Sequence, residues 1–250
     1  MSDPIIIERS AEHPSVQLIR FNRPEKKNAF TRAMYRTMTD ALNAANADAE
    51  IRATVILGTE GCFSAGNDIS DFLAVAMGGS MGQELIDFLY ALVNAEKPLV
   101  SGVDGLAIGI GTTLNLHCDL TVASDRSHFR TPFVDLALVP EAGSSLIVPR
   151  ITGHQRAFAM LVAGEAFTAE DAKQAGLIWK VTTPEDVESQ TIAAAAKLAA
   201  KPPEALKIAR DLVRGPREEI IARIDEEARH FAARMRSDEA RAAFEAFMRR

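Results

Sequence analysis

The chain has 250 residues, of which 47% are hydrophobic and 25% are charged, and its formal net charge is −6. This is the composition of a globular protein, long enough to bury a sizeable core in one large domain or in a domain with an appended arm. The acidic balance argues against a nucleic-acid-binding or membrane-binding surface, because both need a broad basic face.

Targeting signals and metal sites are not indicated. No apolar run approaches the roughly 20 residues that span a bilayer, and no signal-peptide pattern opens the chain, so a cytoplasmic protein is predicted. Cys62 and Cys118 are the only cysteines and lie far apart, which is typical of two reduced structural thiols. His117 and His128 lack the ligand spacing of a metal site and are interpreted as packed or surface side chains.

Short β-rich segments alternate with helical patterns in the first half of the chain. Thr31 is placed to cap a helix in which Met34, Met38 and Leu42 recur on one face, and a second helix is expected over 83–93. This alternation predicts an α/β arrangement with partly buried sheets. Strands are expected at 5–7, 16–21, 54–57, 99–103 and 120–123.

The second half changes character after Pro149 and is almost entirely helical. A helix is expected over 154–163, followed by a short helix that Thr168 caps and Gly176 ends, and then by a strand over 177–181.

Alanine-rich helices follow from residue 184, with breaks at the dipeptides 202–203 and 215–216. The final amphipathic segment has no core of its own, so it must pack on something else. We therefore predict an α/β core over 1–183 and a helical C-terminal arm over 184–250. The arm either embraces a neighbouring subunit or folds back over the core.

A basic turn is the first of three stretches that carry chemistry. It follows a strand and reads Asn22-Arg23-Pro24-Glu25-Lys26-Lys27-Asn28-Ala29, with three basic side chains in five positions. On its own this is a solvated loop. A binding role for the turn is favoured because an acidic protein that binds a polyphosphate must concentrate its cations somewhere.

The second stretch is Cys62-Phe63-Ser64-Ala65-Gly66-Asn67-Asp68-Ile69. Its small residues let the backbone approach a ligand closely, and the turn can leave the Asn67 N–H pointing into a cavity. The pattern alone is also compatible with a simple turn.

The third stretch, 102–114, predicts a strand, a glycine-rich turn and a helix that begins near Gly111 or Thr112. The N–H groups at such a helix start suit an anion, either a phosphate or a developing oxyanion. Leu114 stands where a dinucleotide fingerprint needs glycine or alanine, and no P-loop lysine follows. If both turns end at the same edge of a sheet, the N–H groups of Asn67 and Ile110 form an oxyanion hole.

These three stretches, in this order and at this spacing, resemble the crotonase-like enoyl-CoA hydratase/isomerase family of CoA-dependent enzymes. The resemblance extends over essentially the whole chain. It implies an α/β fold with a spiral core of ββα units, a helical C-terminal arm, and a homotrimer or dimer of trimers. It also implies that Asn67 and Ile110 hold the thioester carbonyl and that no cofactor is needed beyond the CoA moiety of the substrate. The CoA-binding positions implied are Lys26, Lys27, Ala29, Ser64, Ala65, Asp68 and Ile69.

Hydratases of this family carry two glutamates, and the matching positions here are Thr113 and Phe133, which cannot act as acids or bases. Glu141 instead matches the catalytic glutamate of the peroxisomal-type Δ3,Δ2-enoyl-CoA isomerases, for which one carboxylate is enough. The resemblance therefore implies an isomerase that shifts a 3-enoyl-CoA double bond to the 2-trans position. The apolar neighbours Val139 and Ala142 predict a raised pKa for Glu141.

Three other interpretations stay open. A hydratase or other crotonase-like lyase or hydrolase would need a relocated acid. A serine hydrolase would use Ser144 and His154, although the sequence has no Gly-x-Ser-x-Gly elbow. A non-catalytic acyl-CoA-binding protein would bind without turnover. Residues 77–82 are typical of a mobile loop over the acyl site or of plain surface disorder. The candidate second acids for a hydratase are Glu60, Asp68, Asp71 and Glu84.

Overall fold

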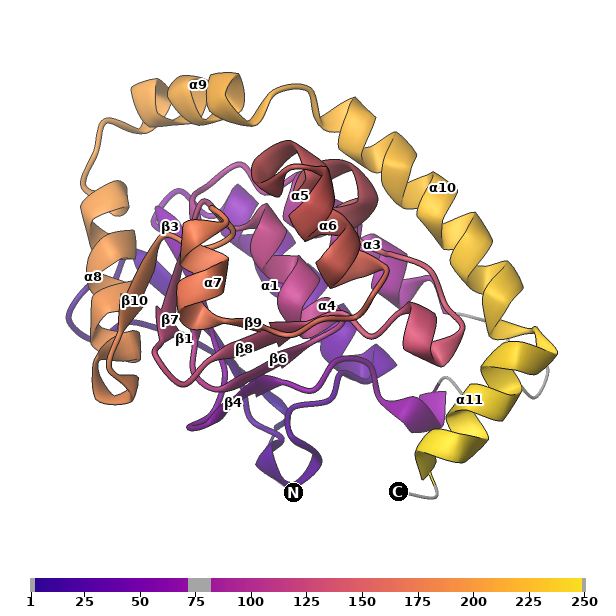
Figure 1. Cartoon of the computed structure of the whole chain (residues 1–250). Coiled ribbons are helices and arrows are strands. Elements are labelled where there is room, and N and C mark those ends of the chain that lie inside the picture. Colours follow the sequence, from indigo (N-terminus) through magenta and orange to yellow (C-terminus); the bar gives the residue numbers. More distant parts are fainter. Residues whose placement is uncertain (1–2, 72–81, 249–250) are drawn as a thin grey trace.

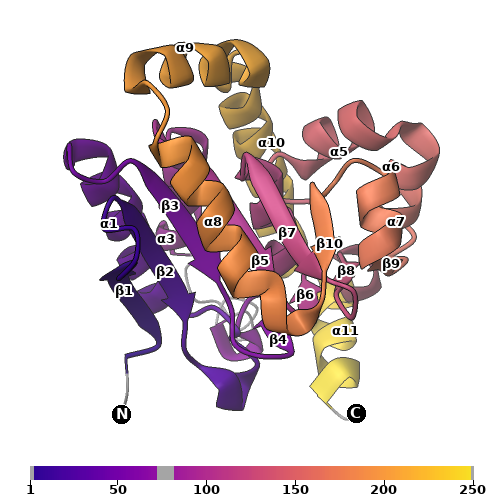
Figure 2. The same cartoon turned by 90° about the vertical axis from the view of Figure 1, so that its left-hand side faces the viewer.

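A computed structural model describes residues 3–71 and 82–248, so most of the loop at 77–82 lies outside the described residues. The molecule (Figure 1) contains a six-stranded sheet in the order β1-β2-β3-β5-β7-β10, whose strands are all labelled in Figure 2. β1 runs antiparallel to β2, and the other neighbours are parallel. The strands are β1 (Ile5–Arg9), β2 (Val16–Phe21), β3 (Ala53–Leu57), β5 (Leu99–Val103), β7 (Leu120–Ser124) and β10 (Lys180–Thr182).

The strands expected in the first half are confirmed, with small shifts at their ends. Every residue of β3 and β5 is buried, as expected for parallel strands that are covered on both faces. The strand expected over 177–181 is displaced toward the C-terminus and becomes β10, because the segment before it continues the turn after Gly176.

A second sheet was not expected from the sequence. It has the order β4-β6-β8-β9 and consists of β4 (Cys62–Ser64), β6 (Leu106–Ile108), β8 (His128–Arg130) and β9 (Phe167–Thr168). β4, β6 and β8 are parallel, and β9 is antiparallel to β8. Such short strands are too brief for an alternating pattern to be visible in the sequence.

Helices α1 (Arg32–Ala47) and α3 (Glu84–Val93) cover one face of the six-stranded sheet. Both helices were predicted. The hydroxyl oxygen of Thr31 accepts a hydrogen bond from the Met34 N–H at 3.4 Å, so the predicted cap is present. Met34, Met38 and Leu42 are all buried in the main core, which confirms the predicted apolar face of α1.

The middle of the chain is built from short helices. They are α4 (Ile110–Thr113), α5 (Ser144–Thr152), α6 (His154–Leu161) and α7 (Ala169–Gln174), with 3-10 turns η1 (Pro24–Lys26), η2 (Leu114–His117), η3 (Val134–Leu136) and η4 (Pro184–Asp186). The predicted helix over 154–163 is α6, and the helix capped by Thr168 is α7. α5 was missed because Pro149, which normally breaks a helix, lies inside it.

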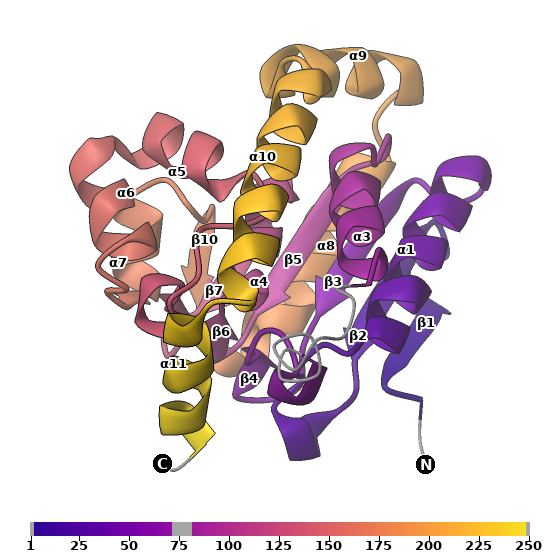
Figure 3. The ribbon, with the colours of Figure 1, turned by 90° about the vertical axis from the view of Figure 1, so that its right-hand side faces the viewer.

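The C-terminal helices wrap around the molecule. α8 (Val187–Ala199) crosses the outer face of the six-stranded sheet and packs on β3, β5 and β7 (Figure 2). α9 (Pro203–Arg214) crosses one end, and α10 (Arg217–Met235) returns along the side against α3 and α5 (Figure 3). α11 (Asp238–Met248) packs on η3. Of the two predicted arrangements, the structure contains the one in which the arm folds back over its own core.

Arginine side chains anchor the arm where α9 leaves the core. Arg210 is buried; its Nε donates to both carboxylate oxygens of Asp119, at 2.8 and 2.9 Å, and its Nη1 donates to the Ala95 carbonyl at 2.5 Å. Arg214 also donates to Asp119, at 2.9 Å. A buried arginine needs such partners, because removing its charge from water without an ion pair or hydrogen bonds would lower the free energy of unfolding by on the order of several kcal/mol.

The two cysteines and the histidines His117 and His128 can be compared with their predicted roles. Cys62 and Cys118 are both free, and burial raises the pKa of the Cys118 thiol to about 12. His117 is buried and His128 is exposed. Over residues 3–71 and 82–248, no helix is long and apolar enough to cross a membrane, and no three His, Cys, Asp or Glu side chains group so as to hold a metal ion.

Candidate active site

Two backbone turns meet at the carboxyl ends of β4 and β6. The strands are parallel neighbours, so the segments that follow them leave the same edge of the second sheet. A Cβ added to Gly66, whose φ is +94°, would lie 2.9 Å from the Ile108 carbonyl oxygen. A Cβ added to Gly111 would lie 2.7 Å from the Ser64 carbonyl oxygen. The two turns therefore approach so closely that only glycine fits at both positions.

The N–H groups of Asn67 and Ile110 are both available in this arrangement. α4 begins at Ile110, one residue before the predicted start, and the N–H groups of Thr112 and Thr113 donate to Gly109 instead. Among the hydrogen bonds of the described residues, neither Asn67 N–H nor Ile110 N–H finds an acceptor. Two unpaired N–H groups on adjacent turns are what an oxyanion hole requires.

The basic turn is fastened to the second motif through backbone atoms. The Ala65 N–H donates to the Lys27 carbonyl at 2.9 Å, and the Ser64 hydroxyl donates to the Asn28 carbonyl at 2.9 Å. The Asn28 amide donates to the Cys62 carbonyl and to the Thr59 hydroxyl, both at 2.9 Å. Asn28 is fully buried with a φ of +52°, so it joins the two motifs. Nothing in the local sequence marks this role, because asparagine is an ordinary turn residue and the neighbouring side chains are basic.

The predicted CoA-binding positions lie together on these two turns, but their side chains differ in environment. Lys26 and Lys27 are exposed, whereas the Ser64 side chain is buried. Asp68 forms an ion pair with Arg23 at 2.6 Å. Burial opposes ionisation of Asp68, but the hydrogen bonds from Arg23 and Ser70 outweigh it and lower the Asp68 pKa. The remaining predicted positions are Ala29, whose carbonyl accepts from Arg23 at 2.9 Å, and the half-buried Ala65 and Ile69.

Glu141 lies in the turn between η3 and α5 and is only 5% exposed. Neither of its carboxylate oxygens has a hydrogen-bond partner among the described residues. Burial, together with the negative charge of Glu227, raises the pKa of Glu141 to about 8. The raised pKa agrees with the prediction from its apolar neighbours, and the contribution of Glu227 is new. A solvent-exposed loop carboxylate is excluded.

Tyr35 connects the two parts of the site. Its hydroxyl donates to the Asn67 side-chain oxygen. Burial raises the pKa of Tyr35 well above its usual value, and the charges of Glu141 and Asp71 raise it further. The Tyr35 hydroxyl thus contacts Asn67 directly and is affected by the charge of Glu141. Nothing local in the sequence marks Tyr35, which lies within the apolar pattern of α1.

The positions that would hold hydratase glutamates are both buried. Thr113 is 1% exposed and Phe133 is 4% exposed. Since neither side chain is a carboxylate, these two positions supply no acid or base to the site. Three of the candidate second acids are engaged elsewhere: Glu60 lies 3.8 Å from Arg126, Asp68 pairs with Arg23, and Glu84 lies 3.3 Å from Arg36. Asp71 accepts a hydrogen bond from the Arg32 N–H at 3.3 Å, and its charge acts on Tyr35.

Ser144 and His154 do not form a catalytic pair. They stand at the two ends of the region around α5, a nine-residue helix about 13 Å long. Ser144 is fully buried, and its hydroxyl has no hydrogen-bond partner among the described residues. The His154 ring packs against Phe158, with 5.9 Å between ring centroids. These environments give the serine hydrolase interpretation no support.

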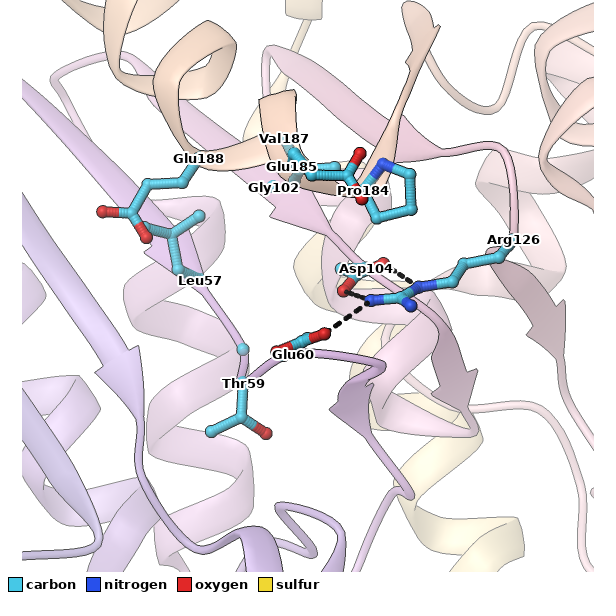
Figure 4. Close-up of a pocket in the computed structure, with 11 residues that line it drawn as sticks. Leu57, Thr59, Glu60, Gly102, Asp104, Arg126, Pro184, Glu185, Val187 and Glu188 are labelled. Carbon is cyan, nitrogen blue, oxygen red and sulfur yellow. Dashed lines mark hydrogen bonds and ion pairs between the residues drawn. The ribbon is translucent and has the colours of Figure 1, made fainter.

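A cavity of about 310 Å³ lies elsewhere, between the carboxyl ends of β3 and β5 and the start of α8 (Figure 4). Arg126 donates two hydrogen bonds to Asp104, at 2.6 and 2.8 Å, on one wall, and Glu60, Glu185 and Glu188 lie around the opening. Its lining residues include Glu60 but none of Glu141, Asn67 and Ile110. This mostly acidic cavity is distinct from the site at Glu141.

The chain belongs to the enoyl-CoA hydratase/isomerase family, whose family model matches residues 11–250. It is 35% identical to enoyl-CoA delta isomerase 2 of Rattus norvegicus over 93% of this chain and 61% of the relative, so the chain spans about three fifths of that protein's length. It is 32% identical to 2,3-dehydroadipyl-CoA hydratase of Escherichia coli, over 81% of this chain and 80% of the relative.

A solved structure, that of OdaA from Pseudomonas aeruginosa, superimposes with a TM-score of 0.94 at 39% identity, covering 100% of both chains. The enoyl-CoA hydratase/isomerase from Pseudoalteromonas atlantica superimposes with a TM-score of 0.92 at 34% identity, over 99% of this chain and 97% of the other. The predicted crotonase-like fold with a helical C-terminal region is thereby confirmed.

Proposed function

We propose that the chain is an enoyl-CoA isomerase that converts a 3-enoyl-CoA into the 2-trans-enoyl-CoA. One observation carries the proposal: Glu141 is a buried carboxylate without a hydrogen-bond partner among the described residues, and its charge acts on Tyr35, which hydrogen-bonds Asn67. The hydratase positions hold Thr113 and Phe133. One base with an oxyanion hole suits a proton shift, whereas adding water across a double bond calls for groups that activate the water.

The reaction moves one proton and one double bond. The Glu141 carboxylate removes a proton from C2 of the 3-enoyl thioester, and the thioester oxygen becomes an enolate oxygen that accepts hydrogen bonds from the N–H groups of Asn67 and Ile110. Electron density then shifts so that C2 and C3 become doubly bonded. Glu141 returns the proton to C4, and the carboxylate is regenerated without gain or loss of water.

The environment of Glu141 suits this role. A carboxylate with a pKa of about 8 is a far stronger base than an exposed one, and it also releases the proton readily to C4. Burial supplies most of this basicity, since the site has no hydrogen-bond donor that would stabilise the carboxylate among the described residues. A binding role alone would not need a buried, unpaired carboxylate.

The CoA moiety is proposed to lie along the basic turn. Lys26 and Lys27 are exposed there, on a chain whose net charge is −6, so they offer phosphate groups a local cationic surface. No cofactor beyond this CoA moiety is proposed.

A homotrimer or dimer of trimers is proposed as the assembly. α9 carries an exposed apolar face, where Ile208 is 55%, Leu212 80% and Val213 88% exposed. Large apolar side chains gathered on one helix mark interaction surfaces more often than solvent faces. Light scattering coupled to size exclusion measures the assembly, and a monomer at micromolar concentration would contradict this part of the proposal.

A hydratase is the second candidate, and two observations favour it. A relative with hydratase in its name covers most of this chain, and the charge of Asp71 acts on Tyr35, so Asp71 is the candidate for a second acid. Such an enzyme would add water to a 2-trans-enoyl-CoA. The hydratase product is heavier than the isomerase product by about 18 mass units, because it has gained one water molecule.

The test is to incubate the purified protein separately with 3-hexenoyl-CoA and 2-trans-hexenoyl-CoA and to resolve the products by chromatography and mass spectrometry. Conversion of the 3-enoyl substrate to 2-trans-hexenoyl-CoA at constant mass supports the isomerase. Gain of water from the 2-trans substrate, without conversion of the 3-enoyl substrate, contradicts it in favour of the hydratase. Binding of both without turnover contradicts it in favour of a non-catalytic acyl-CoA-binding protein.

A further inference from the structure

The turn that bears Glu141 has an unfavourable backbone. Ala142 has a φ of +62° and Gly143 a φ of +71°, so two consecutive residues are left-handed, and the first of them carries a side chain. A left-handed non-glycine residue costs about 1 to 2 kcal/mol, and such a conformation persists only where its surroundings hold it. The contacts around this turn therefore decide where the Glu141 carboxylate points.

A carboxylate from the arm makes the principal contact. Glu227 lies on α10, far along the chain, and is only 6% exposed. Its Oε2 accepts a hydrogen bond from the Gly143 N–H at 2.6 Å, and its Oε1 accepts one from the Ser145 N–H at 2.9 Å. These donors are the N-cap and the second residue of α5, and the Gly143 cap has no side chain of its own. Glu227 thus fills the role of the missing capping residue.

Packing and one further hydrogen bond complete the hold. Ile220 and Ile224, also on α10, lie closest to the open side of Gly143, at 3.2 and 3.6 Å from a Cβ placed there. On the other side, the His117 Nε2 donates to the Ala142 carbonyl at 2.8 Å. Burial lowers the pKa of His117 to about 4, so this ring stays neutral near neutral pH.

We propose that Glu227 is a positioning residue, which holds the strained Glu141 turn from the C-terminal arm and thereby sets the geometry of the catalytic base. The proposal rests on the function proposed above for Glu141. Glu227 donates no proton and touches no substrate in this account; it acts through the backbone of residues 143 and 145.

The same contact has an electrostatic consequence. The negative charge of Glu227 adds to burial in raising the Glu141 pKa, so its removal lowers that pKa and moves the acid limb of the pH–rate profile to lower pH. Arg223 faces Glu227 and donates to the Ser145 hydroxyl at 3.1 Å. The charged and titratable groups that act on the pair or its turn are Tyr35 from α1, Arg223 from α10 and His117 from η2. Asp71 acts on Tyr35 in turn, and Arg214 acts on His117.

The experiment compares Glu227→Gln, Glu227→Asp and a matched control, Glu226→Gln. Glu226 is the neighbouring residue on α10 and contacts Arg223 at 3.1 Å, with 51% of its side chain exposed. On 3-hexenoyl-CoA, Glu227→Gln should lower kcat at least about tenfold and up to about 100-fold, because a small misplacement of a catalytic group has effects of that size. The KM of Glu227→Gln should equal that of wild type, since Glu227 does not contact CoA in this account. Glu227→Asp keeps the charge but shortens the reach, so kcat should fall while the pH profile holds.

A measurement that needs no catalytic turnover tests the role of Glu227 independently of the proposed reaction. The Glu141 carboxyl is titrated by ¹³C NMR in protein with labelled glutamate, with Glu141→Gln used for assignment. Glu227→Gln should move this titration to lower pH, and Glu226→Gln should not. A Glu227→Gln enzyme with wild-type kcat and an unmoved Glu141 titration would overturn the proposal.

If Glu227→Gln does not fold, Glu227→Asp carries the test, and wild-type kcat in that variant overturns the proposal. If the wild-type protein fails to convert 3-hexenoyl-CoA, the proposed function fails, while the NMR titration still decides whether Glu227 controls the Glu141 turn.

Discussion

The two halves of the candidate site are held in different ways. The proposed oxyanion hole lies on turns that directly follow β4 and β6, and its contacts come from motifs visible in the sequence, such as the approach of Gly66 to Ile108. The Glu141 turn is strained, and it is held by a carboxylate on α10 that lies 84 positions further along the chain than Gly143. The hole is thus a local product of two strands, whereas the base depends on how the arm docks.

This contrast predicts that removing the base stabilises the protein. The pKa of Glu141 is about 8 in the folded protein against an ordinary 4.5, so the folded state binds this proton more tightly than the unfolded chain. The free energy of unfolding therefore falls as pH rises from 4.5 to 8. Glu141→Gln should be more stable than wild type at pH 9 by on the order of 3 to 5 kcal/mol, with no such gain near pH 4. Urea unfolding at both pH values measures this, and equal stabilities at pH 9 would contradict it.

Disrupting the hole should have the opposite effect on stability. Gly111→Ala places a Cβ 2.7 Å from the Ser64 carbonyl oxygen and forces the two turns apart. We expect kcat to fall about 100-fold, as when one oxyanion donor is lost, and the free energy of unfolding to fall by about 1 to 3 kcal/mol. Gly61→Ala is the control for the loss of a left-handed glycine: its φ is +70° and nothing lies within 4 Å of its added Cβ, so it should lose about 1 kcal/mol of stability but keep wild-type kcat. Wild-type kcat in folded Gly111→Ala would mean that the hole lies elsewhere.

Tyr35 tests the connection between the two halves. Tyr35→Phe removes the hydrogen bond to the Asn67 side chain but keeps the buried ring, so kcat should fall by about tenfold, the effect of one net hydrogen bond of about 1.5 kcal/mol. Tyr90→Phe, the only other tyrosine, loses a hydrogen bond to Asp225 and should keep wild-type kcat. Equal kcat values for the two variants would show that Tyr35 is only a core residue.

The smallest effect is expected at the basic turn. Replacing Lys26 and Lys27 together with alanine should raise KM by about tenfold or less and leave kcat unchanged, because the two exposed cations are proposed to meet phosphate groups remote from the reaction. The salt dependence of KM should weaken as well. Lys180→Ala, an exposed lysine on β10, serves as the control. An unchanged KM in the double variant would place CoA elsewhere.

The sequence predicted the elements whose patterns are local. The buried strands β3 and β5 and the Thr31 cap of α1 follow from runs and spacings of a few residues. The second sheet escaped prediction because its strands are too short to show a period, and α5 escaped because Pro149 is usually a helix breaker.

For the candidate site, the same distinction holds. Glu141, Asn67 and Ile110 were named from family resemblance and neighbouring motifs. Tyr35 and Glu227 were not, since their partners are distant in the chain and only folding brings them together. The raised pKa of Glu141 was foreseen from its apolar neighbours, but the charge of Glu227 behind it could not be.

The most direct test of the account is the kcat of Glu141→Gln on 3-hexenoyl-CoA relative to wild type, measured on protein whose fold is checked by circular dichroism. The substitution keeps the size of the side chain and removes its ability to accept and return a proton. We predict a fall of about 1000-fold, within the range that general acid–base catalysis supplies. A kcat within about tenfold of wild type would contradict the assignment of Glu141 as the base, because that loss is no larger than the one expected from a single hydrogen bond.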